Sequence, residues 1–343
     1  MSGIWKFIRY SGVGVFCVGI LTAITSCTQE ELLRALAVFL AFLLAAGGGG
    51  GETTSEEGFS FNGTFTRIYW GDDTDDAIKR CDITGALPCT PEVVFSQAGT
   101  DPEGLDVDFQ RGFVYWADDD DGNNPRIFRC DITGALPCTR ELVIDVSTDN
   151  LEGIEVAVLA GFLYWTEDDD DRIQRCSITG ALPCTAQTVF SGTEAEMAHG
   201  VAVDEINGFL YWTHDDTTGH IYRCSITGAI PCSVETVSSD ASLTEPEGIA
   251  LDLVRGFVYI GEDDDMEIER CPISGALPCS TEDVHSAVTD QPSGLDIDVV
   301  NGLLYWSDQD DEDIHRCDIT GALPCTAVLV ISSEDAEDMS LGP

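Results

Sequence analysis

A nine-residue phrase, Cys-x-Ile-[Thr/Ser]-Gly-Ala-[Leu/Ile]-Pro-Cys, occurs six times in this chain of 343 residues. Successive copies begin 46 to 49 residues apart. A period of this length indicates one supersecondary unit stacked on copies of itself, so the repeat constrains the fold more than any other feature. The copies run from Cys81 to Cys89, Cys130 to Cys138, Cys176 to Cys184, Cys224 to Cys232, Cys271 to Cys279 and Cys317 to Cys325.

Four short segments in each unit have the pattern of β-strands. In the first, Gly104-Leu105-Asp106-Val107-Asp108, apolar and polar residues alternate as in a half-buried strand. Turn residues such as Asn207-Gly208 follow, and then an aromatic and β-branched segment such as Phe113-Val114-Tyr115-Trp116. After an acidic loop, the third segment ends at the first cysteine of the phrase and the fourth follows the second cysteine. Four antiparallel strands in each of six units predict an all-β fold, a six-bladed β-propeller over residues 57–332.

Residues 333–343 form a tail after the sixth unit, where the first strand of a further unit begins to repeat. We expect this tail to act as a ring-closing strand that pairs with the first unit. The spacing puts Ser340 at the position of the glycine, such as Gly294, that lies in the first strand of the other units.

The second strand of most units carries Tyr-Trp-[Thr/Ala/Gly/Ser]-[Asp/Glu/His], as in Tyr164-Trp165-Thr166-Glu167 and Tyr305-Trp306-Ser307-Asp308. An Ile-x-Arg such as Ile173-Gln174-Arg175 follows. These residues resemble the class B (YWTD) repeats of the low-density lipoprotein receptor family, which also occur in nidogen. The resemblance covers about four-fifths of the chain and implies a six-bladed propeller. The chain departs from the family pattern at His214, at Ile260 and in its cysteine pairs, so the resemblance does not extend to a receptor role.

The charge of the chain is strongly negative, with 62 acidic residues against 16 basic ones and a formal net charge of -46. Phosphate binding needs clustered lysines and arginines, so this composition argues against nucleic acid as a partner. The expected partners are divalent cations and cationic or protein ligands. A saline habitat, in which the carboxylates serve only for solvation, remains an alternative explanation.

Residues 1–27 have the pattern of an export signal: a basic start at Lys6 and Arg9 and an apolar run from Val13 to Ile24. The end of this segment, Ile24-Thr25-Ser26-Cys27, is similar to a bacterial lipobox, in which the cysteine is lipidated. We therefore predict an exported protein held at the cell surface or outer membrane through Cys27, and otherwise a secreted one.

Residues 28–56 are predicted to contain a hydrophobic helix, residues 32–46, and a glycine-rich tether. The helix is too short for a standard membrane span, so whether it crosses, lies in or leaves the membrane stays open. Any membrane contact is expected through this N-terminal part alone.

The two cysteines of each phrase flank a seven-residue turn, so they can face each other across a hairpin. In an exported chain this arrangement predicts six disulfides, one in each blade. Closing so short a loop stabilises each hairpin by roughly 2–3 kcal/mol in the chain-entropy model. Zinc sites favour two to four residues between paired ligands and redox motifs favour two, so both alternatives fit the spacing poorly.

A run of carboxylates follows each aromatic pair, and in a propeller all such loops lie on one face around the central channel. Dense carboxylates bind hard cations, which makes calcium the expected cofactor of this face; a solvated acidic surface is the alternative. The first carboxylate of each run has a structural alternative, hydrogen bonding between strands. The candidate metal ligands are Asp72, Asp118, Asp119, Asp121, Glu167, Asp169, Asp215, Asp263, Asp308 and Asp310.

The sequence favours a non-enzymatic extracellular or cell-surface binding or adhesion scaffold. No catalytic residue is predicted, because the five histidines share no common neighbour and no Gly-x-Ser-x-Gly occurs. Two alternatives stay open: a calcium-dependent hydrolase resembling the gluconolactonase and regucalcin propellers, and a structural surface or matrix protein. In the hydrolase resemblance unlike residues of different blades hold a channel metal, and here Asp106, Glu155 and Asp296 take such positions without a histidine or asparagine. The histidines are His199, His214, His220, His285 and His315.

Overall fold

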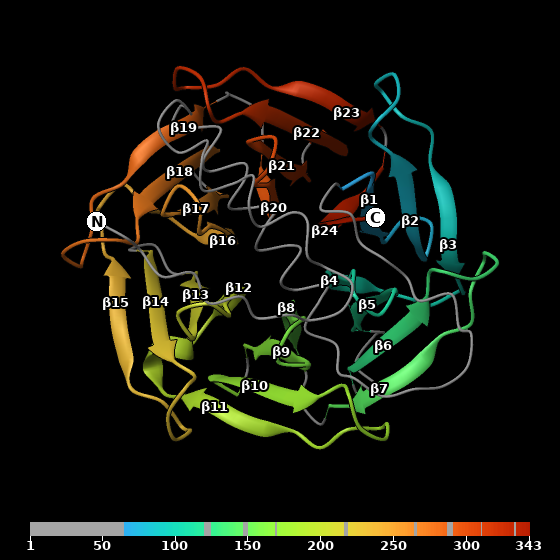
Figure 1. Cartoon of the computed structure of the whole chain (residues 1–343), viewed down its shortest axis with the longest axis horizontal. Helices are drawn as coiled ribbons and strands as arrows, with labels where there is room; N and C mark the ends of the chain where they lie inside the picture. Colours follow the sequence, from blue (N-terminus) through green and yellow to red (C-terminus); the bar gives the residue numbers. More distant parts are fainter. Residues whose placement is uncertain are drawn as a thin grey trace, which may run out of the picture.

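The computed structural model of the chain describes residues 65–119, 125–146, 150–168, 170–215, 219–263, 266–286, 291–309, 311–332 and 334–343. These residues form six four-stranded antiparallel sheets arranged around a central axis (Figure 1). The predicted six-bladed β-propeller is therefore confirmed. The predictions for Cys27, for residues 1–56 and for Asp121, Asp169 and Asp310 lie outside the described residues. Within the described part, no helix has the length and apolar character that a membrane span requires.

The blades follow the chain order, and the strands of each blade run from the innermost to the outermost. The strands are β24 (Ala336–Gly342), β1 (Arg67–Asp72), β2 (Ala77–Asp82) and β3 (Glu92–Ser96) in blade one; β4 (Pro102–Asp108), β5 (Phe113–Asp118), β6 (Arg126–Asp131) and β7 (Glu141–Asp145) in blade two; β8 (Leu151–Ala157), β9 (Phe162–Glu167), β10 (Arg172–Ser177) and β11 (Gln187–Ser191) in blade three; β12 (Ala198–Asp204), β13 (Phe209–His214), β14 (His220–Ser225) and β15 (Val234–Ser238) in blade four; β16 (Pro246–Asp252), β17 (Phe257–Glu262), β18 (Glu267–Pro272) and β19 (Glu282–Ser286) in blade five; and β20 (Pro292–Asp298), β21 (Leu303–Asp308), β22 (Asp313–Asp318) and β23 (Val328–Ser332) in blade six.

Strand β24 supplies the innermost strand of blade one and pairs antiparallel with β1. Its register places Ser340 opposite Tyr69, just as Asp106 lies opposite Tyr115 in blade two. The glycine position therefore belongs to Asp338, and the assignment of Ser340 to it is wrong. The reason is a shorter connection: three residues separate β23 from β24, whereas five separate β19 from β20.

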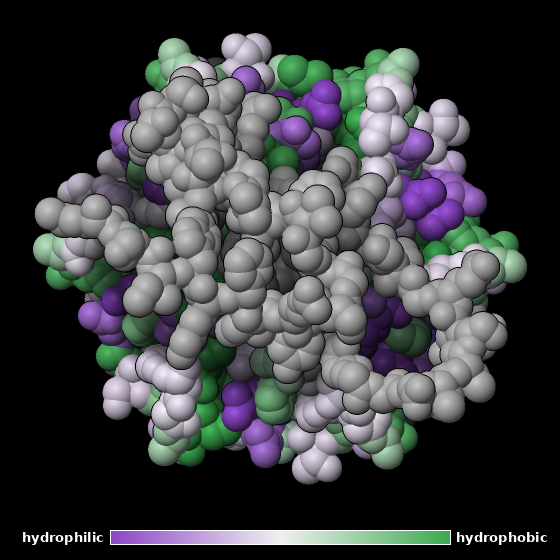
Figure 2. All heavy atoms as spheres, in the orientation of Figure 1, coloured by the Kyte–Doolittle hydropathy of each residue, from purple (hydrophilic) through white to green (hydrophobic). Residues whose placement is uncertain are grey.

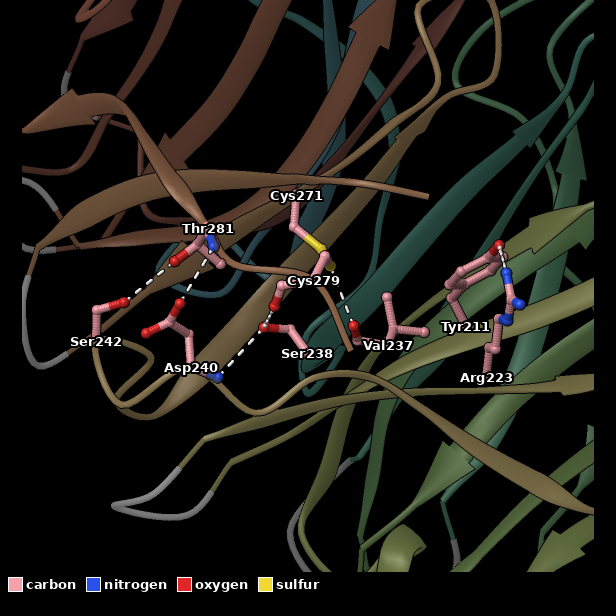
Figure 3. The surroundings of a disulfide bond; sticks show 9 residues. All are labelled: Tyr211, Arg223, Val237, Ser238, Asp240, Ser242, Cys271, Cys279 and Thr281. Atoms are coloured by element: carbon pink, nitrogen blue, oxygen red, sulfur yellow. Dashed lines mark hydrogen bonds between the residues drawn. A yellow bond between two sulfur atoms is a disulfide. The ribbon is translucent and has the colours of Figure 1, made fainter. Parts of the chain in front are cut away.

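The second strands carry the core of the blades, because the Tyr-Trp pairs are buried at the interfaces between neighbouring sheets. Each tyrosine hydroxyl also accepts a hydrogen bond from an arginine of the third strand, at 3.0 to 3.5 Å. Tyr211 and Arg223 show this contact in blade four (Figure 3). The Ile-x-Arg of the repeat thus satisfies the one polar atom that the buried tyrosine brings.

All six predicted disulfides are present, with Cα atoms 5.9–6.0 Å apart. Each second cysteine also donates its backbone N–H to the outermost strand of the preceding blade, at 2.8–2.9 Å. In Figure 3 Cys279 of blade five lies against Val237 and Ser238 of blade four, and the Ser238 hydroxyl donates to the Cys279 carbonyl. The repeated phrase therefore joins adjacent blades at their outer edges as well as closing a hairpin.

Hydrophilic and hydrophobic residues are mixed around the visible parts of the rim in the space-filling view (Figure 2). The rim is where the disulfide hairpins and outermost strands lie (Figure 1). Its mixed character distinguishes it from the carboxylate-rich surroundings of the central cavity.

Candidate functional site

The six innermost strands surround a central cavity of about 260 Å³. Glycines let these strands approach each other closely. A Cβ atom at Gly104 would lie 2.3 Å from the Glu152 carbonyl oxygen, and one at Gly248 would lie 2.1 Å from that of Ser293. Backbone atoms of neighbouring blades thus pack against each other, and side chains on either side of the glycines line the cavity.

One end of the cavity is ringed by the second residue of each innermost strand, and we call these residues the mouth ring. Four of the six are glutamates, and they come from four different blades. Inside the ring, His199 Nε2 contacts Glu152 Oε2 at 3.1 Å, and the Ser293 hydroxyl donates to the Glu337 carbonyl at 2.9 Å. In order around the axis the ring consists of Glu337, Glu103, Glu152, His199, Glu247 and Ser293.

The mouth ring holds its carboxyl groups in an environment that disfavours their charge. Burial, followed by the charges of Glu152 and Glu337, raises the pKa of Glu103 to about 8. Burial, Asp335 and Asp73 raise the pKa of Glu337 to about 7. A cation in the mouth would relieve this repulsion.

His199 behaves in the opposite way, because carboxylates surround it. Burial alone would lower its pKa, but Glu152, Glu247 and Asp215 hold that pKa well above the usual value. Burial would likewise raise the pKa of Glu152, and the charge of His199 brings that pKa below its usual value. Both shifts favour the charged forms, an imidazolium beside a carboxylate.

Carboxylates of the connecting loops form a second tier on the same face. Burial, a hydrogen bond to Asp73 and the charge of Asp119 raise the pKa of Asp101 to about 7. Burial, offset in part by His199, raises the pKa of Asp215 to about 6. The acidic loops thus share one face with the mouth ring, and their repulsion adds to that of the ring.

A deeper layer of carboxylates joins neighbouring blades, and we call its members the latch carboxylates: Asp106, Glu155, Asp296 and Asp338. Each accepts a backbone N–H from the next blade. The partners and distances are Asp106 with Val107 (2.6 Å) and Val156 (2.7 Å), Asp296 with Ile297 (2.6 Å) and Leu341 (2.8 Å), Asp338 with Met339 and Leu105 (both 2.8 Å), and Glu155 with Val203.

These bonds give the latch carboxylates a structural role. Burial nevertheless raises the pKa of Asp296 and of Asp338 to about 7. The three positions that the hydrolase alternative singled out, Asp106, Glu155 and Asp296, are thus engaged in joining blades.

Four of the candidate metal ligands lie buried at the ends of second strands, each bonded within its own part of the ring. Asp72 accepts a hydrogen bond from Lys79 and Asp118 one from Arg140, at 2.9 and 3.0 Å. Glu167 accepts the Trp165 indole N–H at 2.7 Å. Asp308 accepts backbone N–H groups of Gln291 and Asp311, both at 3.2 Å. These bonds agree with the structural alternative for the first residue of each run.

The other described candidates connect the acidic loops to the loops between blades. The backbone N–H groups of Asp119, Asp215 and Asp263 donate to carbonyls at the entry of the innermost strands, at 2.9–3.2 Å. None of the candidate ligands belongs to a described group of three whose ligand atoms lie within 4.8 Å of one another.

Such a group does occur among the described residues in blade five, where Glu267, Glu269 and Asp283 come together. Sequence reasoning missed it because its members lie in strands rather than in an acidic loop. A signal was present, since Glu269 stands opposite Ile260 where Lys79 stands opposite Trp70 in blade one.

No family model and no curated protein matches the sequence. Solved structures share the fold. The nidogen propeller of a nidogen/laminin complex has a TM-score of 0.67 and 16% identity, over 81% of this chain and 98% of that one. A gluconolactonase from Xanthomonas campestris has a TM-score of 0.56 and 16% identity, over 78% and 84% of the two chains. Regucalcin from Agrobacterium tumefaciens, described as a calcium-binding protein, has a TM-score of 0.53 and 12% identity, over 71% of this chain and 78% of that one.

These comparisons place the chain in the class of six-bladed β-propellers. At such identities they show the fold alone, and the class includes enzymes as well as non-enzymatic proteins. Six disulfides indicate an oxidising compartment, extracellular or periplasmic.

Proposed function

We propose that this protein is an exported, non-enzymatic binding propeller that takes up cations or cationic protein ligands on its acidic face. The mouth ring carries the proposal: four glutamates from four blades encircle one end of the central cavity. The second tier around Asp101 and Asp215 extends the negative field outward. A field of one sign at a cavity mouth attracts and concentrates ligands of the opposite charge.

We also propose that the six blades of this protein are related to the class B (YWTD) repeats. The tyrosines, the tryptophans and the Thr or Ser after them have structural roles that six-fold repetition explains. The hydroxyl of Thr213, for example, donates to the Glu247 carbonyl of the next blade at 2.9 Å, and Thr166 bonds to the His199 carbonyl in the same way. We further propose that the N-terminal segment directs export and that Cys27, as a lipid anchor, holds the protein at the cell surface or outer membrane.

A binding measurement on the full chain tests the function. We expect an oligolysine peptide to bind in low salt by calorimetry and to bind more weakly as salt rises. Glu103→Gln/Glu337→Gln should weaken binding by about tenfold, which corresponds to about 1.4 kcal/mol. The matched control, Glu92→Gln/Glu282→Gln, replaces two carboxyl groups at exposed outer-strand positions and should leave the affinity within about twofold. Absence of any cation binding by the unaltered chain would reject the proposal.

A calcium-dependent hydrolase is the second candidate, and the His199–Glu152 pair at the cavity mouth is the observation that favours it. An imidazolium beside a carboxylate can serve as a general acid. We expect no hydrolysis of D-glucono-δ-lactone in the presence of calcium. Turnover that His199→Asn abolishes would replace the binding function with this one.

A structural matrix component is the third interpretation of such a surface. Sedimentation measured over a range of protein concentrations separates it from a binding module, which should stay monomeric throughout.

A further inference from the structure

At the level of Asp106, Glu155 and Asp296, the wall of the central cavity has carboxylates on one side and apolar side chains on the other. In every blade, one residue of the innermost strand stands opposite the tyrosine of the neighbouring second strand. Blades four and five place alanines there, and these alanines line the cavity next to each other. The six residues in ring order are Ser340, Asp106, Glu155, Ala202, Ala250 and Asp296.

The residue that follows this position presents its backbone N–H to the cavity side, where carboxylates accept it. Five of the six N–H groups are satisfied in this way, those of Val107, Val156, Val203, Ile297 and Leu341. The sixth belongs to Leu251, and the two residues that would supply its carboxylate by the same geometry are Ala202 and Ala250. Neither alanine side chain can accept a hydrogen bond, so the carboxylate that meets the other five N–H groups is missing here. One donor therefore faces the cavity beside its apolar wall.

Size and charge restrict what the cavity can hold. Its volume of about 260 Å³ is a little below the range of about 300–1,000 Å³ of drug-sized ligand sites. Among the described residues, no three ligand atoms of the mouth ring lie close enough to coordinate one metal ion. The cavity thus suits a small organic cation better than a bare metal ion.

We propose that the cavity binds a small organic amine whose ammonium group lies in the mouth ring and whose apolar body lies against Ala202 and Ala250. The distance along β16 from Glu247 to Ala250 is at most about 10 Å at 3.3 Å per residue, because the register shifts between Pro246 and Ile249. An arylalkyl or alkyl amine spans this distance. An oxygen on the far end of that body would accept the Leu251 N–H. This inference rests on the proposed function, because it names the ligand class of the same acidic mouth.

Three related probes separate these features in calorimetric titrations of the full chain. Phenethylamine carries the ammonium and the apolar body, tyramine adds a hydroxyl at the far end, and N-acetyltyramine lacks the charge. We expect both amines to bind, tyramine more tightly, and N-acetyltyramine to bind at least about tenfold more weakly, a loss of about 1.4 kcal/mol. A phenylalanyl-glycine amide presents the same ammonium and ring; tighter binding of this peptide would identify a protein N-terminus as the source, and weaker binding a free amine.

Two variants test the apolar wall without changing any charge. Ala250→Leu and Ala202→Leu each fill part of the cavity, so each should weaken amine binding by about tenfold or more. Thermal melting of each variant shows whether it is folded. If neither folds, the comparison of Glu103→Gln/Glu337→Gln with Glu92→Gln/Glu282→Gln still decides whether the amines bind at the mouth.

The results distinguish this inference from the proposed function. If the filled variants fold and keep full affinity for the amines, the cavity is not the site and the inference fails, while salt-sensitive oligolysine binding would still support the acidic face. Equal affinity for tyramine and N-acetyltyramine would likewise overturn the inference. If neither oligolysine nor the amines bind the unaltered chain, both proposals fail.

Discussion

At the scale of single residues, Lys79 shows how this acidic chain stabilises its buried carboxylates. Its ammonium group contacts Asp72 at 2.9 Å, Asp75 at 2.6 Å and Glu334 at 2.5 Å, and its side chain is 8% exposed. Removing one partner of a buried ion cluster leaves uncompensated charge, so Lys79→Met should lower the free energy of unfolding by about 3–5 kcal/mol. Urea denaturation measures the loss.

The control for this prediction is an ion pair on the surface. Arg126 and Asp145 lie 3.5 Å apart with 40% and 59% of their side chains exposed, so Arg126→Gln should cost less than about 1 kcal/mol. If Lys79→Met lowers the free energy of unfolding by no more than Arg126→Gln does, Lys79 is not needed to stabilise the buried carboxylates.

The mouth ring predicts a pH dependence of stability with a definite sign. Its folded-state pKa values, about 8 for Glu103 and about 7 for Glu337, exceed the unfolded value of about 4.3. Between about pH 4 and pH 8 the folded state therefore holds protons that the unfolded state has released, so these groups lower stability as pH rises. His199, whose pKa is also raised, lowers stability with rising pH in the same sense, whereas Glu152, whose pKa is lowered, acts in the opposite sense. A variant is therefore needed to isolate the effect of Glu103 and Glu337.

Glu103→Gln/Glu337→Gln should flatten that dependence. We expect the fall in the free energy of unfolding between pH 5 and pH 8 to shrink by about 1–2 kcal/mol, less than the unscreened limit because the mouth is open to water. Urea unfolding at both pH values measures it. An unchanged slope would mean that these carboxyl groups titrate normally.

At the scale of elements, the regular features were predictable because they follow from local pattern. Two-residue alternation and turn residues predict the strands, and the repeated phrase predicts the disulfides, without any knowledge of tertiary contacts. The place of β24 depends instead on the length of one loop, which is why Ser340 was misplaced and Asp338 was not recognised. A period in sequence fixes which strands recur, but not the register of the strand that closes the ring.

Strand β24 predicts a sharp dependence on the C-terminal residues. It pairs with β1 and connects blade one to blade two through the bond from the Leu105 N–H to Asp338. Deleting residues 336–343 would expose the inner edge of blade one, so we expect loss of cooperative unfolding and of most thermal stability, read by circular dichroism. Deleting Pro343 alone removes the hydrogen bond that its carbonyl accepts from Arg67 and should be mild. An unchanged melting temperature after the longer deletion would contradict this role.

At the scale of the whole molecule, the acidic face was predictable and its organisation was not. Glu103, Glu152 and Glu247 each precede a strand glycine, a signal visible in the sequence that gains meaning only when six strands meet at one axis. The alanines at the level of the latch carboxylates carry no signal of their own, since alanine in a strand indicates nothing about a ligand. What a residue does in this fold depends on its place in the ring.

The net charge of the whole molecule allows a test of whether the carboxylates serve binding or only solvation. With a net charge of -46, sodium chloride should raise the melting temperature by screening repulsion on the acidic face. Calcium chloride at equal ionic strength should raise it further, by about 2–4 °C for each 1 kcal/mol of specific binding. The carboxylates of Glu267, Glu269 and Asp283 are the described group close enough to share one ion. Glu269→Gln should therefore remove the calcium increment and Asp145→Asn should not. Equal melting temperatures in the two salts would mean that the carboxylates of the intact protein serve solvation alone.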